Sequence, residues 1–225
     1  MEKYLPILKK SKLFSDVSEE EIKSMLTCLD ARLDTFPKGS YVLHQGEILH
    51  HIAIVAEGSL LIQNDDFWGN RSIINHIGIG EIFGEAYAAP TSGALLNDVI
   101  AASNSSIIFF DIHRILTTCS SSCRFHTRVI QNLFYALSEK NRGLVQKLGH
   151  MSQRSTREKL LSYLSEQAKK QHSSQFEIPF NRQQLADFLS VDRSAMSNEL
   201  SKLRAEGILT TKKNTFHLFA PDKDT

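Results

Sequence analysis

The sequence has little of several things that mark special classes of protein. Its 225 residues include only 11 glycines, 5 prolines and 3 cysteines. This composition excludes collagen-like and low-complexity disordered chains, and so few cysteines exclude a disulfide scaffold. The longest apolar runs, such as residues 107–110, are far too short to cross a bilayer, and the first residues lack the apolar core of a secretory signal. We therefore expect a globular protein with free thiols in the cytoplasm.

The chain also carries little net charge, +1 at neutral pH. The charge is unevenly distributed, because residues 1–151 have a net charge of −2 and residues 152–225 a net charge of +3. A basic excess of this size favours a polyanionic partner for the C-terminal third only slightly. The charge distribution does not identify the partner, so the assignment depends on the sequence motifs.

The first half predicts one short helix followed by a β-rich unit. Residues 18–21 form a capping-box pattern before apolar residues three and four apart, which is typical of an amphipathic helix. Short β-type runs then alternate with glycines up to residue 110, a pattern that indicates a small antiparallel barrel or roll. The runs are residues 41–43, 52–55, 60–62, 72–74 and 106–110. The glycines expected in turns with positive φ are Gly39, Gly46, Gly58, Gly69, Gly78, Gly80 and Gly84.

A long helix with a narrow apolar stripe follows. Its heptad seam consists of Ile130, Phe134, Leu137, Asn141, Leu144, Leu148 and Met151. A narrow stripe of this kind needs a partner helix, and the simplest partner is a second copy, so the pattern predicts a homodimer. Asn141 would then fix the register of the pair. The alternative is that the helix packs on its own barrel, and both packings can occur together on different faces.

The C-terminal third predicts a winged helix. Ser155 to Glu158 form a second capping box, and a domain boundary is expected near residues 149–154. Asn181 is the expected cap of a helix over residues 182–190, and Asp192 the cap of a second helix over residues 193–205. A β-hairpin with a basic tip is expected over residues 208–218, which completes a helix-turn-helix with a wing.

Roles follow from how such a unit contacts double-stranded DNA. The exposed first turn of the second helix enters the major groove, so Arg193, Ser194, Ser197 and Asn198 are expected to meet base edges. The basic side chains expected to meet phosphates are Arg182, Lys202, Lys212 and Lys213. Apolar residues expected to pack the two helices together are Leu185, Ala186, Leu189, Val191, Ala195, Met196, Leu200 and Leu203.

Several spaced motifs resemble the CRP/FNR family of bacterial transcription regulators across nearly the whole chain. They are Phe36-Pro37-Lys38-Gly39, Gln45-Gly46-Glu47, Glu57-Gly58, Gly80 through Glu85, Arg182 through Ala186, and Asp192-Arg193. The resemblance implies an α+β chain with a cyclic-nucleotide-binding-like roll over residues 1–118, a dimerisation helix over 119–151 and a winged helix over 152–225. It also implies an operator of two pseudo-palindromic half-sites, with RNA polymerase as a candidate partner.

The chain departs from family members that bind cyclic AMP. Those members have an Arg and a small hydroxyl residue about ten residues after the Phe-Gly-Glu turn, and here the places fall on Leu95 and Leu96. Gly84 and Glu85 are kept, but two leucines cannot hold a phosphate. We therefore expect an unidentified small-molecule effector that is not a cyclic nucleotide.

Other chemistries are less well supported by the residues. Three cysteines are too few for the four-cysteine iron-sulfur cluster of the oxygen-sensing branch, so no cofactor is expected. If the stretch is helical, Cys119, Cys123 and His126 lie on one face, which makes them candidates for a metal site or a redox thiol pair, although the same spacing continues into the dimer seam. The alternatives are a thiol- or metal-based redox regulator, a thiol-dependent reductase, or a module acting on a protein partner. No nucleophile-base pair supports an enzyme.

Overall fold

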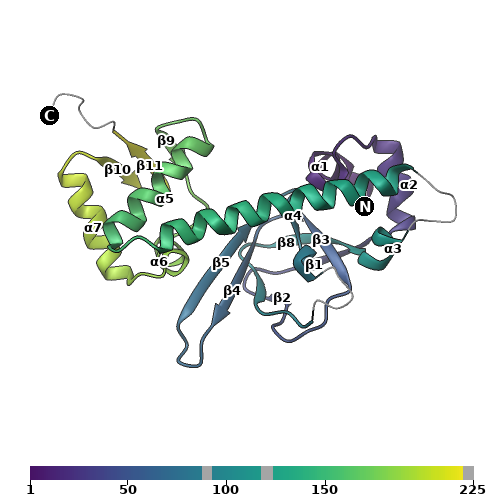
Figure 1. Cartoon of the computed structure of the whole chain (residues 1–225), viewed down its shortest axis with the longest axis horizontal. Coiled ribbons are helices and arrows are strands. Elements are labelled where there is room, and N and C mark those ends of the chain that lie inside the picture. The colour runs from purple at the N-terminus through teal and green to yellow at the C-terminus, as the bar shows by residue number, and fades with distance from the viewer. Residues whose placement is uncertain (88–92, 118–123, 220–225) are drawn as a thin grey trace. The chain divides into compact units, whose positions relative to one another are not determined.

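The computed structural model describes residues 1–87, 93–117 and 124–219 (Figure 1). The chain forms two compact units, each considered by itself below. The first consists of residues 1–68 and 74–142. The second consists of residues 69–73 together with the chain from Gly143 onward. No described helix is both long and apolar enough to cross a membrane.

Two four-stranded sheets form the roll, and all of their residues belong to the first unit except 71–73. One has the strand order β1-β8-β3-β6 and the other the order β2-β7-β4-β5. The strands are β1 (Arg32–Phe36), β2 (Tyr41–Leu43), β3 (His51–Glu57), β4 (Leu60–Asp65), β5 (Arg71–Ile77), β6 (Ile82–Phe83), β7 (Asp98–Ala101) and β8 (Ser105–Asp111). Sequence-distant neighbours such as β1 and β8 pair antiparallel, which confirms the expected roll and the α+β class.

Strand β3 lies at the centre of the roll because both of its faces are buried. Ile52 and Ile54 point into one apolar cluster, and Ala53 and Val55 point into a second. This follows from the alternation of side chains along a strand. Each fully buried isoleucine contributes about 1.5–3 kcal/mol of burial free energy. Such a strand shows no polar alternation, which is why it appears in the sequence as a continuous apolar run.

Short helices cover one side of the roll. They are η1 (Glu2–Tyr4), α1 (Leu5–Lys10), η2 (Lys12–Phe14), α2 (Glu19–Cys28) and, later in the chain, α3 (Ile112–Leu116). A further short helix, η3 (Glu85–Tyr87), packs through Tyr87 against the second apolar cluster. Helix α2 begins with the expected capping box, in which Ser18 and Glu21 each accept a backbone N–H from the other. Helix α2 was expected from the sequence, and α3 lies at the start of the helical stretch expected after Asp111. The other elements were not singled out, since elements of three to six residues show no periodicity.

Helix α4 (Arg124–Met151) supplies the remaining cover of the roll. Val129, Leu133 and Ala136 are buried in the same cluster as Ile52 and the short N-terminal helices. Asn132 lies on this face too, and its amide donates to the backbone carbonyls of Leu13 and Ser15 at 3.0 and 2.9 Å. The buried amide is thus satisfied and ties α4 to the N-terminal segment.

The second unit contains α5 (Thr156–Lys170), β9 (Gln175–Glu177), α6 (Arg182–Leu189), α7 (Arg193–Ala205), β10 (Leu209–Lys212) and β11 (Thr215–Leu218). The strands form a sheet of order β10-β11-β9. Three expected helix caps are confirmed: Ser155 and Asn181 form capping boxes, and Asp192 accepts the backbone N–H of Ala195. The helix-turn-helix and its wing therefore begin where the sequence places them.

Some expectations about the roll were incomplete or wrong. Strands β1, β6 and β7 were not singled out, because they are short and depend on partners far along the chain. Six of the seven glycines have positive φ as expected, but Gly78 does not. Its backbone N–H instead donates to the carboxylate of Glu81 at 2.7 Å.

We expect Gly58→Ala to destabilise the roll much more than Gly69→Ala. Both glycines have a φ of +81°, so both substitutions carry the same backbone strain. At Gly58 a Cβ would also lie 2.4 Å from the carbonyl oxygen of Asn104, whereas at Gly69 it would meet open space. The added clash should lower the free energy of unfolding by about 1–3 kcal/mol more, measured by urea denaturation. Equal losses would contradict the close approach.

Candidate nucleic-acid interface and effector region

Helices α6 and α7 are joined by a turn that aims the start of α7 outward. Ser190 ends α6 in the left-handed region at φ 51°, and the backbone N–H of Val191 donates to the carbonyl of Ala186 at 3.0 Å. Asp192 then caps α7. The turn closes the end of one helix and starts the next within three residues. The expected packing residues are buried in this corner, except that Val191 is half-buried and Ala195 is exposed.

All four residues expected to meet base edges are exposed on the first turns of α7: Arg193, Ser194, Ser197 and Asn198. Two of them are already engaged within the helix. The Ser194 hydroxyl donates to the Asp192 carboxylate, and this hydrogen bond is the main cause that lowers the pKa of that carboxyl. The Ser197 hydroxyl donates to the backbone carbonyl of Arg193 at 2.8 Å. The longer side chains of Arg193 and Asn198 are therefore the better candidates for base contacts.

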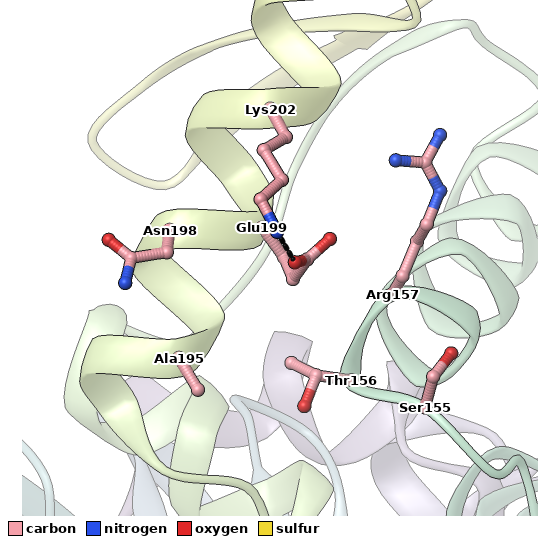
Figure 2. A pocket seen from close by; sticks show the side chains of 7 residues that line it. All are labelled: Ser155, Thr156, Arg157, Ala195, Asn198, Glu199 and Lys202. Carbon is pink, nitrogen blue, oxygen red and sulfur yellow. Dashed lines mark hydrogen bonds and ion pairs between the residues drawn. The ribbon is translucent and has the colours of Figure 1, made fainter.

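A shallow hollow of about 510 Å³ lies beside this surface, between α7 and the start of α5 (Figure 2). Its residues are Ser155, Thr156, Arg157, Ala195, Asn198, Glu199 and Lys202. Figure 2 shows the α7 side chains on one wall and the α5 side chains on the other. The exposure of Ala195 is explained here, because it faces the hollow instead of α6. Of these residues, the sequence predicted DNA contacts for Asn198 and Lys202 but none for the residues at the start of α5.

Arg157 pairs with Glu206 just beyond the end of α7, with one N–H donating to Oε1 at 2.9 Å. This pairing is the main cause that lowers the pKa of the Glu206 carboxyl. Lys202 pairs in the same way with Glu199 at 2.6 Å. Both cations therefore carry a partner carboxylate at the edge of the hollow, which reduces the positive charge available there.

The remaining basic candidates differ from one another. Lys212 and Lys213 are exposed at the tip of the wing, where Lys213 has a φ of 56°. Arg182 is half-buried: it donates to the hydroxyl of Thr211 at 2.7 Å and lies over the ring of Phe216, 4.9 Å from its centroid. Burial lowers the pKa of its guanidinium, which nevertheless stays charged at neutral pH. The two lysines are thus exposed to solvent, while Arg182 also contacts the wing through Thr211 and Phe216.

The last turns of α4 belong to the second unit and contact α5 and α6. The Lys147 ammonium lies 4.3 Å from the centroid of the Phe188 ring, and burial lowers its pKa to about 8. His150 is buried between the hydroxyl of Ser162, at 2.7 Å, and the carboxylate of Glu166. A ring with both nitrogens hydrogen-bonded has a fixed orientation. The end of α4 and α5 therefore form one rigid corner.

Most of the seam residues of α4 are exposed. Phe134, Leu144 and Leu148 have exposed fractions of 67%, 49% and 65%. Leu137 and Asn141 are exposed as well, whereas Met151 is half-buried and Ile130 packs partly against the roll. The side chains that α4 buries against the roll belong to a different stripe. The helix thus has one face packed on the roll and a second face that is exposed.

The effector region contains the four residues singled out in the roll. Leu95 is buried in the apolar cluster, while Leu96 is 68% exposed and its backbone N–H donates to the hydroxyl of Tyr87 at 3.0 Å. Gly84 has a φ of +85° in the turn after β6. Glu85 is buried and paired with Lys140 of α4, a partner that no local pattern could reveal.

The candidate thiol and metal residues are only partly described. Cys119 and Cys123 lie outside the described residues. His126 is buried, and its Nε2 lies 3.8 Å from the sulfur of Cys28. Within residues 1–87, 93–117 and 124–219, no three His, Cys, Asp or Glu side chains form a group that could hold a metal ion.

Comparison with known families agrees with this architecture. A family model described as cyclic nucleotide-binding domain matches residues 33–122, and one described as Crp-like helix-turn-helix domain matches residues 158–223. The two matches together span well over half of the chain. The chain belongs to the CRP/FNR family of regulators.

Solved structures show the same fold at low sequence identity. The c-di-GMP-responsive global regulator CLP of Xanthomonas campestris has a TM-score of 0.72 and 18% identity, with 89% of this chain and 98% of that chain covered. FixK2 of Bradyrhizobium japonicum has a TM-score of 0.68 and 16% identity, covering 84% and 93%. The catabolite activator protein of Thermus thermophilus has a TM-score of 0.53 and 21% identity, covering 93% and 94%. No curated protein sequence matches the chain.

Proposed function

We propose that the protein is a homodimeric, sequence-specific DNA-binding transcription regulator that acts in the cytoplasm, not an enzyme, and that it responds to an effector other than a cyclic nucleotide. The observation that carries the proposal is the exposed first turn of α7. It presents Arg193 and Asn198 from a helix that is capped by Asp192 and buried on its other face. A rigid, exposed helix start is what reading a major groove requires.

The two side chains suit different bases. Arg193 can donate two parallel hydrogen bonds to guanine, and Asn198 can pair with both edge groups of adenine. Each such pair is worth about 1–3 kcal/mol of discrimination against a wrong base. Lys212 and Lys213 at the wing tip suit phosphate contacts, which add affinity without sequence information. We assign Arg182 a shared role, since its guanidinium already holds Thr211 and Phe216.

The exposed seam of α4 supports a dimer. Three of its residues, Phe134, Leu144 and Leu148, have exposed fractions of 67%, 49% and 65%. An exposed apolar stripe of this kind marks an interaction site. A second copy of α4 covers it with the same spacing of apolar residues, and two copies of α7 then read two half-sites. A change in seam packing would alter the spacing of the two α7 helices, which gives the effector a route to the DNA.

The effector region argues against cyclic nucleotides. A cyclic phosphate needs a cation and hydrogen-bond donors, but Leu95 is buried among apolar side chains and Leu96 is a leucine exposed to solvent. Residues 93–106 contain no arginine. Glu85, the carboxylate that could meet a ribose hydroxyl, is held by Lys140.

Replacing Arg193 tests the DNA-reading role. We expect Arg193→Ala to weaken binding to a duplex selected from a random pool by roughly 5- to 150-fold, and to relax the preference at one base pair. The matched control is Arg204→Ala, which removes the same charge from the exposed last turn of α7. The measurement is fluorescence anisotropy at fixed salt. If both variants lose affinity equally and keep the sequence preference, Arg193 does not read bases.

Placing a charge on the seam tests the dimer. We expect Leu144→Glu to sediment as a monomer at concentrations where the unmodified protein sediments as a dimer, because two carboxylates would face each other in the seam. Leu144 is half exposed in the single chain, so its fold should persist. Gln146→Glu adds the same charge at an exposed position off the seam and should leave the dimer intact. A dimeric Leu144→Glu protein, or a monomeric unmodified protein, would contradict the proposed interface.

Calorimetric titration tests the effector assignment. We expect no heat of binding from cyclic AMP or cyclic GMP at micromolar concentrations, because the place of the phosphate is taken by leucines. Micromolar affinity for either nucleotide would overturn this part of the proposal without touching the DNA-binding part.

A further inference from the structure

One ion pair joins the roll to α4 at the effector region. The Lys140 ammonium lies 2.8 Å from Oε1 of Glu85, and it also donates to the backbone carbonyl of Ile82. The Glu85 side chain is only 6% exposed and that of Lys140 27%. The pair therefore connects the turn after β6 to the helix that carries the exposed seam.

The backbone directly before Glu85 is closely packed. At Gly84 an added Cβ would lie 2.7 Å from a methyl of Leu49 and 3.0 Å from the carbonyl oxygen of His51. The turn thus packs directly against the start of β3. The backbone that carries Glu85 therefore has little room to follow the lysine if α4 shifts.

The pair is not an efficient source of stability. Oε2 of Glu85 is buried and has no hydrogen-bond partner within the described residues. A buried ion pair has a large desolvation cost, and well-packed apolar residues in its place are often as stable or more so. Such pairs can instead favour one arrangement of two elements over others.

We propose that the Lys140 side chain acts on the roll as a bound ligand would. Its ammonium pairs with the Glu85 carboxylate, so α4 is held to the effector region by the protein itself, without a bound small molecule. We call the Lys140–Glu85 pair the latch. This latch sets the packing of α4 and through it the affinity for DNA, which rests on the function proposed above.

Three variants separate the latch from simple structural support. Lys140→Met keeps the aliphatic stem but leaves Glu85 buried and unpaired, Glu85→Met removes the carboxylate and every hydrogen-bond acceptor at similar length, and the double variant replaces the ion pair by two apolar side chains. Arg142→Met is the control, because Arg142 is an exposed cation half a turn further along α4. Each protein is measured for hydrogen exchange of α4 amides, thermal midpoint and affinity for the selected duplex.

We expect amides near residue 140 to exchange about tenfold faster or more in all three latch variants, the factor expected from losing a hydrogen bond between charged groups. Lys140→Met should also lower the thermal midpoint and weaken binding to the duplex by about 5- to 150-fold. In the double variant the midpoint should recover while the affinity for the duplex stays low. Arg142→Met should resemble the unmodified protein in every measurement.

Unchanged exchange of α4 in the double variant would overturn the latch, and so would recovery of both midpoint and affinity, which is the pattern of a purely structural pair. An unmodified protein that binds no selected duplex would refute the proposed function instead, while the exchange data would still decide whether Lys140 holds α4.

Discussion

Helix α4 has to satisfy two apolar faces at once, and the rest of the structure depends on this constraint. One face buries Val129, Leu133 and Ala136 against the roll. The other leaves Phe134 and Leu148 largely in water. Full burial of side chains of this size contributes about 1.5–3 kcal/mol each, so an uncovered seam is costly. The proposed dimer would remove this cost by covering the second face with a second copy of α4.

The polar contacts of α4 fix its position more narrowly than apolar packing alone. Asn132 is satisfied by two backbone carbonyls at one end of the helix, and His150 by a hydroxyl and a carboxylate at the other. Lys140 lies between them and pairs with Glu85. Hydrogen bonds depend strongly on distance and angle, whereas apolar contacts tolerate sliding. Together these contacts allow α4 only a small number of arrangements.

Local signals were enough to predict the DNA-reading unit but not the effector region. Caps at Asn181 and Asp192, and the bounds of α7, depend on residues within four positions and were confirmed. The partners of Glu85 and His126 are Lys140 and Cys28, 55 and 98 positions away, and no periodic pattern records such contacts. Arg182 shows the same limit, because its charge was visible in the sequence but its packing on Phe216 was not. Strands β1 and β7 were missed because they are short and exist through distant pairing.

The most direct test of the central claim is selection of bound duplexes from a random DNA pool by the unmodified protein. A dimer joined through α4 should enrich an inverted repeat whose two half-sites are centred about one helical turn, roughly 34 Å, apart. That result requires two copies of α7 held at a fixed spacing by the α4 seam. No enrichment, or enrichment of a single half-site without its inverted copy, would contradict it.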